Sequence, residues 1–456
     1  MESFSGINSL NNLPEYALTA LAALELNGFY ANIVGGCVRD LFLNKTPYDY
    51  DITTNALPEQ ICEVFKDYHC IKTGIKHGTV TVVINKTPVE ITTYRIDGKY
   101  TDSRHPDSVT FTDRLDEDLA RRDFTINAMA YNPSRGVTDI FGGQTDLEKR
   151  LIRCVGDADT RFNEDALRIL RALRFAAVLE FDIEKSTAVS IHKNKQLLKN
   201  IAAERIRTEF FKLICGNSAS KILDEYKDVF AVFIPQLMPM FGFEQHSKYH
   251  CYDVWHHSLC ALEHTEPLPI LRLGALFHDI GKPDVFTLDE NGCGHFYSHA
   301  VRSVSLTRDI LASLKCDNTT ARSVLTIIEN HDVCIADSKK SIKKWLGRLG
   351  EKPFFMLIAL QKADAAAHCA PYCTTRPPQL ERIRQTAEEI IREGECFSLC
   401  DLAVNGRDMI ALGFSGKQIG CILDMLLNSV INGETKNEKQ SLTEKAKIFK
   451  NTINIQ

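Results

Sequence analysis

The strongest constraint on the fold is a change of pattern near residue 150. Before it, two β-rich runs, HGTVTVVI and VEITTYRI, are separated only by Asn85–Pro88, which predicts a β-hairpin. After it, stretches such as AAERIRTEFFKLIC repeat apolar residues at helical spacing. A chain of 456 residues holds about three domains at roughly 100–200 residues each. We therefore predict an α+β protein, with a mixed α/β domain first and helical domains behind it.

Further elements are expected around that hairpin. Residues 14–27 are predicted to form a helix, which Pro14 opens and Gly28 ends. FYANIV predicts a strand, GGCVRDLF a tight turn running into a helix, and DYDIT a second strand. Residues 96–117 are polar and show no clear period, which predicts a mobile loop.

Asp49 and Asp51 are the first candidates for chemistry. In a strand, residues i and i+2 point the same way, so we expect both carboxylates on one face, close enough to share a divalent ion. Magnesium prefers oxygen ligands and usually keeps substrate phosphates among them. Glu90, on the VEITTYR run, is the best candidate for a third carboxylate. Taken alone, a D-x-D pattern more often marks a solvated strand end.

The turn ahead of these aspartates reverses that balance. Gly35 and Gly36 let backbone N–H groups approach a triphosphate closely, and Arg39 follows within one helical turn. Two divalent ions held by nearby carboxylates can activate an attacking hydroxyl and stabilise a leaving pyrophosphate. The combination indicates nucleotidyl transfer.

The segment RFNEDALRILRALR offers a means of choosing a base. Read as one helix, it makes Asp165 and Arg168 neighbours, followed by Arg171 and Arg174 in a stripe that needs an anionic partner. Cytosine and adenine both present an amino donor beside a ring-nitrogen acceptor, which a carboxylate and a guanidinium would match. Uracil and guanine reverse that order. The simpler alternative is an ion-paired amphipathic helix.

Several of these segments together resemble a known family. GGCVRDLFLNKTPYDYDITT resembles the signature of the class II tRNA nucleotidyltransferases and the related bacterial poly(A) polymerases. RRDFTINAMAYN is similar to their second motif, GDADTRFNEDALRILRALRFAA to the nucleotide-selecting motif, and ERIRTEFFKLI to the motif that closes the neck. The resemblance covers at least residues 15–215 and implies a polymerase-β-like head followed by an all-α neck, body and tail.

The resemblance also assigns roles, domains and ligands. It implies that Asp49 and Asp51 bind Mg²⁺, and that CTP and ATP are bound by Gly36, Arg39, Arg122, Asp123, Asp165, Arg168, Arg171 and Arg174. The C-terminal segment DLAVNGRDMIALGFSGKQIGCILDMLL would grip the acceptor and T arms of tRNA, or serve only as a stabilising helical module. The predicted domains are the head, the neck, an HD-type domain and the body and tail, over residues 1–150, 151–244, 245–375 and 376–456.

Eight of the 14 histidines lie between His246 and His299. WHHSL, ALFHDIGKP and KADAA resemble the metal-dependent HD phosphohydrolases, which implies a second divalent or transition metal held by His257, His278, Asp279 and Asp364. His299 and His331 are further candidates. On an ideal helix the adjacent His278 and Asp279 point different ways, so a shared ion needs a local distortion. The alternative is a degenerate, purely structural domain.

We expect CCA addition to the 3′ end of tRNA, with Asp97–Glu117 resembling the loop that helps full CCA-adding members switch from C to A. The alternatives are a poly(A) polymerase, an enzyme that adds only C or only A, or an HD phosphohydrolase acting on RNA ends or cyclic phosphates. The last is disfavoured by the intact D-x-D.

Composition limits the partners and the compartment. The net charge is −5 and the pI is near 6.3, so a basic RNA-binding surface must be local. KKSIKKWLGRLGEK and the lysine-rich tail are candidates, or else solvated helix faces. Fifteen cysteines without a C-x-x-C pair predict buried thiols in a reducing cytoplasm. No signal pattern is found, and no apolar run approaches the roughly 20 residues that span a bilayer. The oligomeric state does not follow from the sequence.

Overall fold

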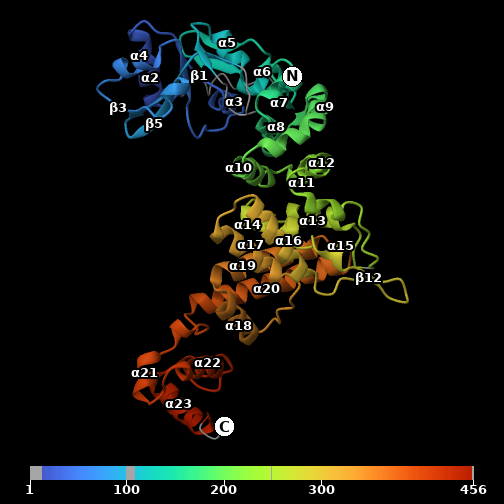
Figure 1. Cartoon of the computed structure of the whole chain (residues 1–456). Coiled ribbons are helices and arrows are strands. Elements are labelled where there is room, and N and C mark those ends of the chain that lie inside the picture. The colour runs from blue at the N-terminus through green and yellow to red at the C-terminus, as the bar shows by residue number, and fades with distance from the viewer. Residues whose placement is uncertain (1–12, 99–107, 248, 454–456) are drawn as a thin grey trace. The chain divides into compact units, whose positions relative to one another are not determined.

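The structure is a computed structural model that describes residues 13–98, 108–247 and 249–453. It divides into two compact units, Met1–Pro235 and Gln236–Gln456 (Figure 1). The expected α+β class is confirmed, since the sheet lies in the first unit and the second is almost wholly helical. The finer division into four domains stays a prediction.

A seven-stranded sheet in the order β3-β4-β5-β2-β1-β8-β9 forms the centre of the first unit. Only β2 and β5 run parallel, and every other neighbouring pair is antiparallel. The strands are β1 (Ala31–Val34), β2 (Ile52–Thr54), β3 (His69–Ile71), β4 (Thr79–Ile84), β5 (Thr87–Thr93), β8 (Met129–Asn132) and β9 (Gly136–Asp139).

The predicted hairpin is confirmed and its turn is tighter than expected. β4 and β5 pair from Thr79 opposite Thr92 to Ile84 opposite Thr87. Asn85 and Lys86 alone make the turn, with φ of 48° and 66°. Two central residues with positive φ match the twist of the flanking strands.

Short helices surround the sheet. They are α2 (Glu15–Leu26), α3 (Gly36–Phe42), α4 (Pro58–Val64), η1 (Ile75–His77), α5 (Leu115–Ala120), η2 (Thr125–Asn127) and α6 (Gly143–Glu148). α2 and α3 confirm the predicted helix after Pro14 and the turn running into a helix. α2 turns Ala17, Ala20, Leu21 and Leu24 inward, whereas Leu18 is exposed.

The prediction of an irregular loop over residues 96–117 is wrong for its described parts. β6 (Arg95–Asp97) and β7 (Val109–Phe111) form an antiparallel pair, and α5 begins at Leu115. Short strands of this kind give little periodic signal, so their pairing is decided by contacts from elsewhere in the fold. Residues 99–107, and with them part of the expected C-to-A switching loop, lie outside the described residues.

The rest of the first unit is helical apart from the two-residue strands β10 (Leu151–Ile152) and β11 (Asp182–Ile183). Its helices are α7 (Ala158–Glu164), α8 (Leu167–Leu179), α9 (Lys185–Asn194), η3 (Lys195–Asn200), α10 (Ala203–Ile214), α11 (Ala219–Glu225) and α12 (Lys227–Phe230). RFNEDALRILRALR was expected to form one helix and instead forms two. Asp165 between them is extended, with φ −136° and ψ 102°.

The second unit is built on a bundle of helices in which α13 packs on α14 and α19, and α14 also packs on α17. Trp255 of α13 is fully buried at its centre. The elements up to residue 392 are η4 (Pro235–Met240), α13 (Val254–Glu263), α14 (Pro269–Phe277), α15 (Lys282–Val285), β12 (Thr287–Leu288), β13 (Gly294–His295), α16 (His299–Ser313), α17 (Asn318–Glu329), α18 (Lys339–Leu349), α19 (Glu351–Ala366) and α20 (Tyr372–Arg392).

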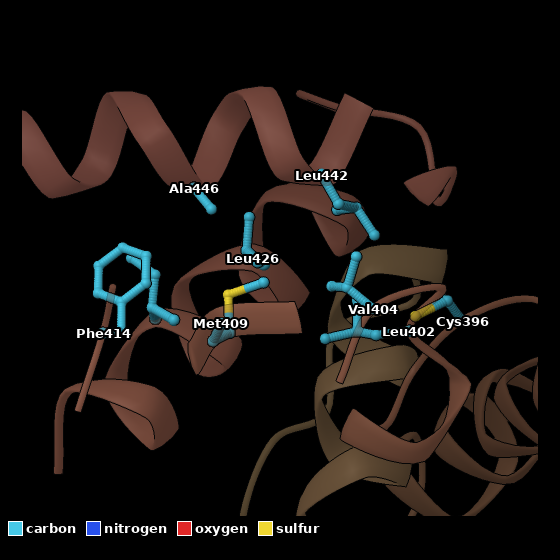
Figure 2. Close-up of a cluster of buried hydrophobic side chains, with 9 residues drawn as sticks. Cys396, Leu402, Val404, Met409, Phe414, Leu426, Leu442 and Ala446 are labelled. Atoms are coloured by element: carbon cyan, nitrogen blue, oxygen red, sulfur yellow. The ribbon is translucent and has the colours of Figure 1, made fainter. Parts of the chain in front are cut away.

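The last segment comprises η5 (Leu399–Asp401), α21 (Gly406–Ala411), α22 (Lys417–Ile431) and α23 (Lys439–Ile453). Figure 2 shows its own small apolar core, where Met409, Phe414, Leu426 and Leu442 meet. Gly413 and Gly416 lie in the break between α21 and α22, whereas Gly420 lies inside α22, which runs for 15 residues.

The structure bears on the predictions about membrane spans, cysteines and basic stretches. Within the described residues, no helix has the length and apolar character needed to cross a bilayer. The expectation of buried thiols is wrong for most cysteines, since only Cys37, Cys154 and Cys396 of the 15 are buried. The basic stretch on α18 is partly neutralised, because Lys339 and Lys343 both form ion pairs with Glu395.

Candidate functional site

The turn between β1 and α3 is shaped by Gly35. Its φ of 82° lies in the region that favours glycine, and a Cβ there would come within 3.0 Å of Arg122 Nη1. Gly36 opens α3, and the guanidinium of Arg39 folds back beside it, donating from Nη1 to Asn127 Oδ1 at 2.8 Å. The turn and two arginines thus lie together, as a phosphate-binding loop requires.

The expected carboxylates lie beside this turn. Asp49 and Asp51 were expected inside a strand, but they precede β2, and the backbone carbonyl of Asp51 accepts a hydrogen bond from Val34 N–H at 3.0 Å. β2 pairs in parallel with β5 from Ile52 opposite Ile91, so Asp51 and Glu90 stand one residue before that pair. The sheet therefore brings Glu90 to the two aspartates.

The charges at this place are incompletely neutralised. Desolvation, then the negative charges of Asp49 and Glu90, raise the pKa of Asp51 to about 6, and Arg122 opposes the rise. Mutual repulsion of this kind is relieved by a bound cation, so the oxygen ligand set fits a divalent ion.

Arg122 and Asp123 are held by a network that crosses the first unit. Asp118 is fully buried and pairs with Arg121 at 2.8 Å and with Arg122 at 3.5 Å. Asp123 Oδ2 accepts hydrogen bonds from Arg171 Nε and Nη2 at 2.8 and 2.6 Å. Although burial opposes it, the charge of Arg171 lowers the pKa of Asp123 to about 2.

The predicted contact between Asp165 and Arg168 is corrected. Because the helix breaks at Asp165, its Oδ1 accepts from Leu167 N–H at 3.0 Å, and its Oδ2 accepts from Arg205 Nη2 at 2.9 Å. Arg168 instead donates to Glu164 Oε2 at 2.7 Å. The carboxylate and guanidinium expected to read one base edge therefore each have another partner.

The arginine stripe does not lack anionic partners within the chain. Arg171 is paired with Asp123, and Arg174 Nε donates to Glu209 Oε2 at 2.6 Å. Repulsion among these arginines therefore does not require a bound nucleotide. The pairs agree with the simpler alternative, an ion-paired amphipathic helix.

Phe175 was missed by the sequence reasoning. The guanidinium carbons of Arg39, Arg171 and Arg174 lie 5.0, 5.5 and 3.7 Å from the centre of its buried ring. Arginines over an aromatic face are stabilised by cation–π attraction. The sequence did indicate this contact, since Phe175 follows Arg171 by one helical turn. For Arg205 and Glu209 the sequence contained no indication of a partner beyond their place in the ERIRTEFFKLI motif.

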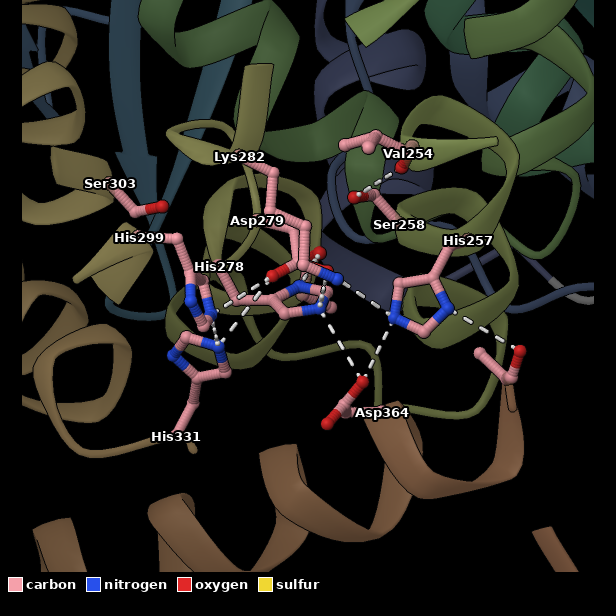
Figure 3. Close-up of polar contacts among 12 residues, drawn as sticks. Val254, His257, Ser258, His278, Asp279, Lys282, His299, Ser303, His331 and Asp364 are labelled. Atoms are coloured by element: carbon pink, nitrogen blue, oxygen red, sulfur yellow. Dashed lines mark hydrogen bonds and ion pairs between the residues drawn. The ribbon is translucent and has the colours of Figure 1, made fainter. Parts of the chain in front are cut away.

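The second unit gathers the predicted HD residues at one place (Figure 3). His257 Nε2 lies 2.9 Å from Asp364 Oδ1 and 3.5 Å from Asp279 Oδ2, and His278 Nε2 lies 3.2 Å from Asp279 Oδ2. The expected local distortion is present, because α14 ends at Phe277 and leaves His278 and Asp279 in the turn that follows.

His299 and His331 complete the other side of the same cluster. Their Nε2 atoms are 3.1 Å apart and lie 3.4 and 3.7 Å from Asp279 Oδ1. Nitrogen and carboxylate atoms this close form two metal-sized groups that share Asp279, one with His257 and His278 and one with His299 and His331. Mixed ligands of this kind suit a transition metal.

The electrostatics of the cluster also fit a cation. Although burial opposes it, the charges of Asp279 and Asp364 raise the pKa of His278 to about 10. His278 Nε2 is buried and, among the described residues, has no partner at hydrogen-bond geometry, although Asp279 Oδ2 lies 3.2 Å away. Lys282 supplies positive charge, with Nζ 2.6 Å from Asp279 Oδ2. A metal ion would satisfy the same carboxylates and the orphaned nitrogen.

Family descriptions match most of the chain in sequence order. Residues 31–153 match the poly A polymerase head domain, and residues 180–240 match the RNA and SrmB-binding site of polymerase A. Residues 248–352 match the HD domain, and residues 301–446 match tRNA nucleotidyltransferase domain 2.

Individual proteins give the same result. A CCA-adding enzyme of Lactobacillus delbrueckii subsp. bulgaricus is 48% identical over 223 residues, 49% of this chain and 55% of that protein. One from Lactobacillus johnsonii is 49% identical over 222 residues, 48% and 55% of the two chains. The chain thus spans about half the length of the curated relatives it matches. The crystal structure of the Bacillus stearothermophilus CCA-adding enzyme in complex with CTP is 28% identical, with a TM-score of 0.72 over 96% of this chain and 98% of that one.

Proposed function

We propose that the chain belongs to the nucleotidyltransferase family that carries a poly A polymerase head and an HD domain, and that it adds CCA to the 3′ end of tRNA. It would do so without a template, using CTP twice and then ATP. The observation that carries the proposal is the meeting of Asp49, Asp51 and Glu90 beside the turn at Gly35. The similar Bacillus protein binds CTP, which supports that choice of nucleotide.

The family uses a divalent metal, and we assign Mg²⁺ held by Asp49, Asp51 and Glu90. When bound, the ion supplies the charge that favours attack of a 3′-hydroxyl on an α-phosphate and the departure of pyrophosphate. Arg39 and Arg122 lie beside the Gly35 turn and would pair with the remaining phosphate charge, whereas the Gly35 N–H already donates to Met129 O at 3.2 Å. Placing the triphosphate is the main task of these residues.

Base choice is assigned to the break between α7 and α8. Asp165 would accept from the amino group of cytosine or adenine, and Arg168 would donate to the ring nitrogen. Both must then exchange the partners described above, Arg205 and Glu164, for the base. A bound nucleotide would break these two ion pairs. Asp123, Arg171 and Arg174 would then lie beside its sugar and phosphates.

The RNA partner rests on the family resemblance. Contact with the acceptor and T arms is assigned to residues 376–456, where Lys439 and Lys445 pair with Asp408 and Glu434. Such phosphate contacts carry affinity and little sequence information. A tRNA substrate also implies the cytoplasm.

The direct test is incubation of the protein with tRNA that lacks its last three nucleotides, given CTP alone, ATP alone, or both. We expect two C residues with CTP alone and C, C and A, then a stop, with both. Product lengths on a sequencing gel decide the result. Long A tails would instead identify a poly(A) polymerase, and a stop after C or A alone would identify a partial enzyme.

A second activity is favoured by the histidine cluster. We propose that His257, His278, Asp279 and Asp364 hold a divalent or transition metal and support hydrolysis of phosphate esters. Elemental analysis of purified protein should find metal bound at the cluster, and Asp279→Asn should lose it while Asp51→Asn keeps it. Equal metal content in wild type and Asp279→Asn would reject the site, which would then be structural.

A further inference from the structure

A cavity of about 620 Å³ opens beside the histidine cluster in the second unit. Asp279, His299 and His331 line it, and so do residues at the start of α20. Ligand pockets typically measure about 300–1,000 Å³, so this one holds a molecule of mononucleotide size. The lining residues from α20 are not among the predicted HD metal ligands.

Three residues of α20 reach the cavity from one helical face. Tyr372, Arg376 and Gln379 are spaced four and three residues apart, which places them above one another on an α-helix. Arg376 Nη1 donates to Gln379 Oε1 at 2.7 Å. Burial and the charge of Asp364 raise the pKa of Tyr372, and the positive charge of Arg376 opposes the rise, so the two side chains are close neighbours. The neutral Gln379 holds the guanidinium, and Tyr372 lies beside it.

Arg376 differs from its neighbours on the same helix in having no carboxylate partner. Arg382 pairs with Asp337 at 3.1 Å, and Arg384 pairs with Glu381 at 2.6 Å. Across residues 249–453, no carboxylate oxygen lies within 4.0 Å of the Arg376 guanidinium, although Asp332 and Asp364 line the same cavity. Lys282, the other cation at the cavity, is already paired with Asp279.

The Arg376 guanidinium has no counter-charge among residues 249–453 and lines the same cavity as the metal-sized cluster. It is therefore suited to bind an anion. Arginine presents parallel N–H donors that match phosphate oxygens. Aromatic side chains at the same cavity, Tyr372 and Phe296, offer faces for an organic group. Phosphate binding to both the cluster and Arg376 would orient one ester bond.

We propose that Arg376 binds the phosphate of a nucleoside monophosphate or of an RNA 3′ end in this cavity, with Tyr372 and Gln379 positioning its guanidinium. The proposal rests on the phosphohydrolase activity proposed above for its chemistry, but anion binding itself does not require turnover. Arg376 is thus a specificity residue of that site, supplied by α20 rather than by the histidine motifs.

Calorimetric titration of the full chain in the presence of Mn²⁺ tests the proposal. The ligands are adenosine 5′-monophosphate and a trinucleotide RNA ending in a 3′-phosphate, which separate the two sources of phosphate. A charged hydrogen bond contributes about 1.5–3 kcal/mol, so Arg376→Gln should weaken binding of the true ligand about 10- to 150-fold. Arg376→Lys should restore part of it. Arg382→Gln, on the same helix but outside the cavity, is the matched control and should bind like wild type.

The outcomes separate the two proposals. Binding by Arg376→Gln within twofold of wild type, or no binding of either ligand by wild type, would overturn the role of Arg376. Hydrolysis of p-nitrophenyl phosphate is measured in parallel. Wild-type binding that depends on Arg376 without any hydrolysis would refute the phosphohydrolase and leave the anion site established. Thermal unfolding of each variant shows that the fold is kept.

Discussion

Replacing Asp51 with asparagine is expected to abolish CTP incorporation into tRNA, with a loss of at least about 10²–10³-fold, the range for removing one preorganised electrostatic group. Asparagine keeps the shape but removes a charge from a set of three carboxylates. The raised pKa of Asp51 indicates that those charges repel one another when no cation is bound. Asp49→Asn should act in the same way, because both carboxylates are assigned to one ion.

The measurement is single-turnover incorporation of labelled CTP into tRNA that lacks its last three nucleotides, over a range of Mg²⁺ concentrations. Asp67→Asn changes an exposed aspartate between α4 and β3 and should leave the rate unchanged. Circular dichroism should report the same fold for all three variants, since neither Asp49 nor Asp51 is a core residue. Wild-type activity in either Asp49→Asn or Asp51→Asn would refute the shared metal site.

Asp165→Ala is expected to relax the choice of base, lowering the preference for CTP over UTP and for ATP over GTP. A mismatched polar edge left buried costs about 1–3 kcal/mol, so the preference should fall about 5- to 150-fold. The ion pair with Arg205 adds a second expectation. Arg205→Ala leaves the carboxylate in place but removes the group that holds it at 2.9 Å, so discrimination should fall by less than in Asp165→Ala.

Ratios of kcat/KM for the four nucleotides measure these effects. Together the two substitutions should lower discrimination no further than Asp165→Ala alone, because Arg205 acts through Asp165. Lys185→Ala, an exposed position at the start of α9, serves as the control. Unchanged discrimination in Asp165→Ala would refute the protein template, and additive losses would mean that Arg205 acts independently.

Features written within a few residues of sequence were predictable. The hairpin of β4 and β5, the glycine turn before α3 and the distortion at His278 all follow from local spacing and backbone preference. The break at Asp165 also had a local signal, because an aspartate side chain readily accepts from a backbone N–H two residues on, as Asp165 does from Leu167 N–H. The regular spacing of the arginines nevertheless favoured one continuous helix in the sequence interpretation.

Pairings between distant segments could not be predicted. Asp165 with Arg205 and Arg174 with Glu209 depend on how helices pack, and many arginine–carboxylate pairings were equally compatible with the sequence. For the same reason, the spacing of the arginines predicted a charged surface but not which carboxylates pair with it. Only the folded structure shows that, among residues 249–453, Arg376 has no carboxylate partner.

The buried ring of Phe175 has a mechanical consequence. Arg39 comes from the turn beside the metal-binding carboxylates, whereas Arg171 and Arg174 come from the helix that starts at the base-selecting break, and all three rest on one ring. Under the proposed function, a shift of α8 on binding a purine instead of a pyrimidine would change the packing of Phe175 against Arg39. The size of the base would in this way affect the residue proposed to bind the triphosphate.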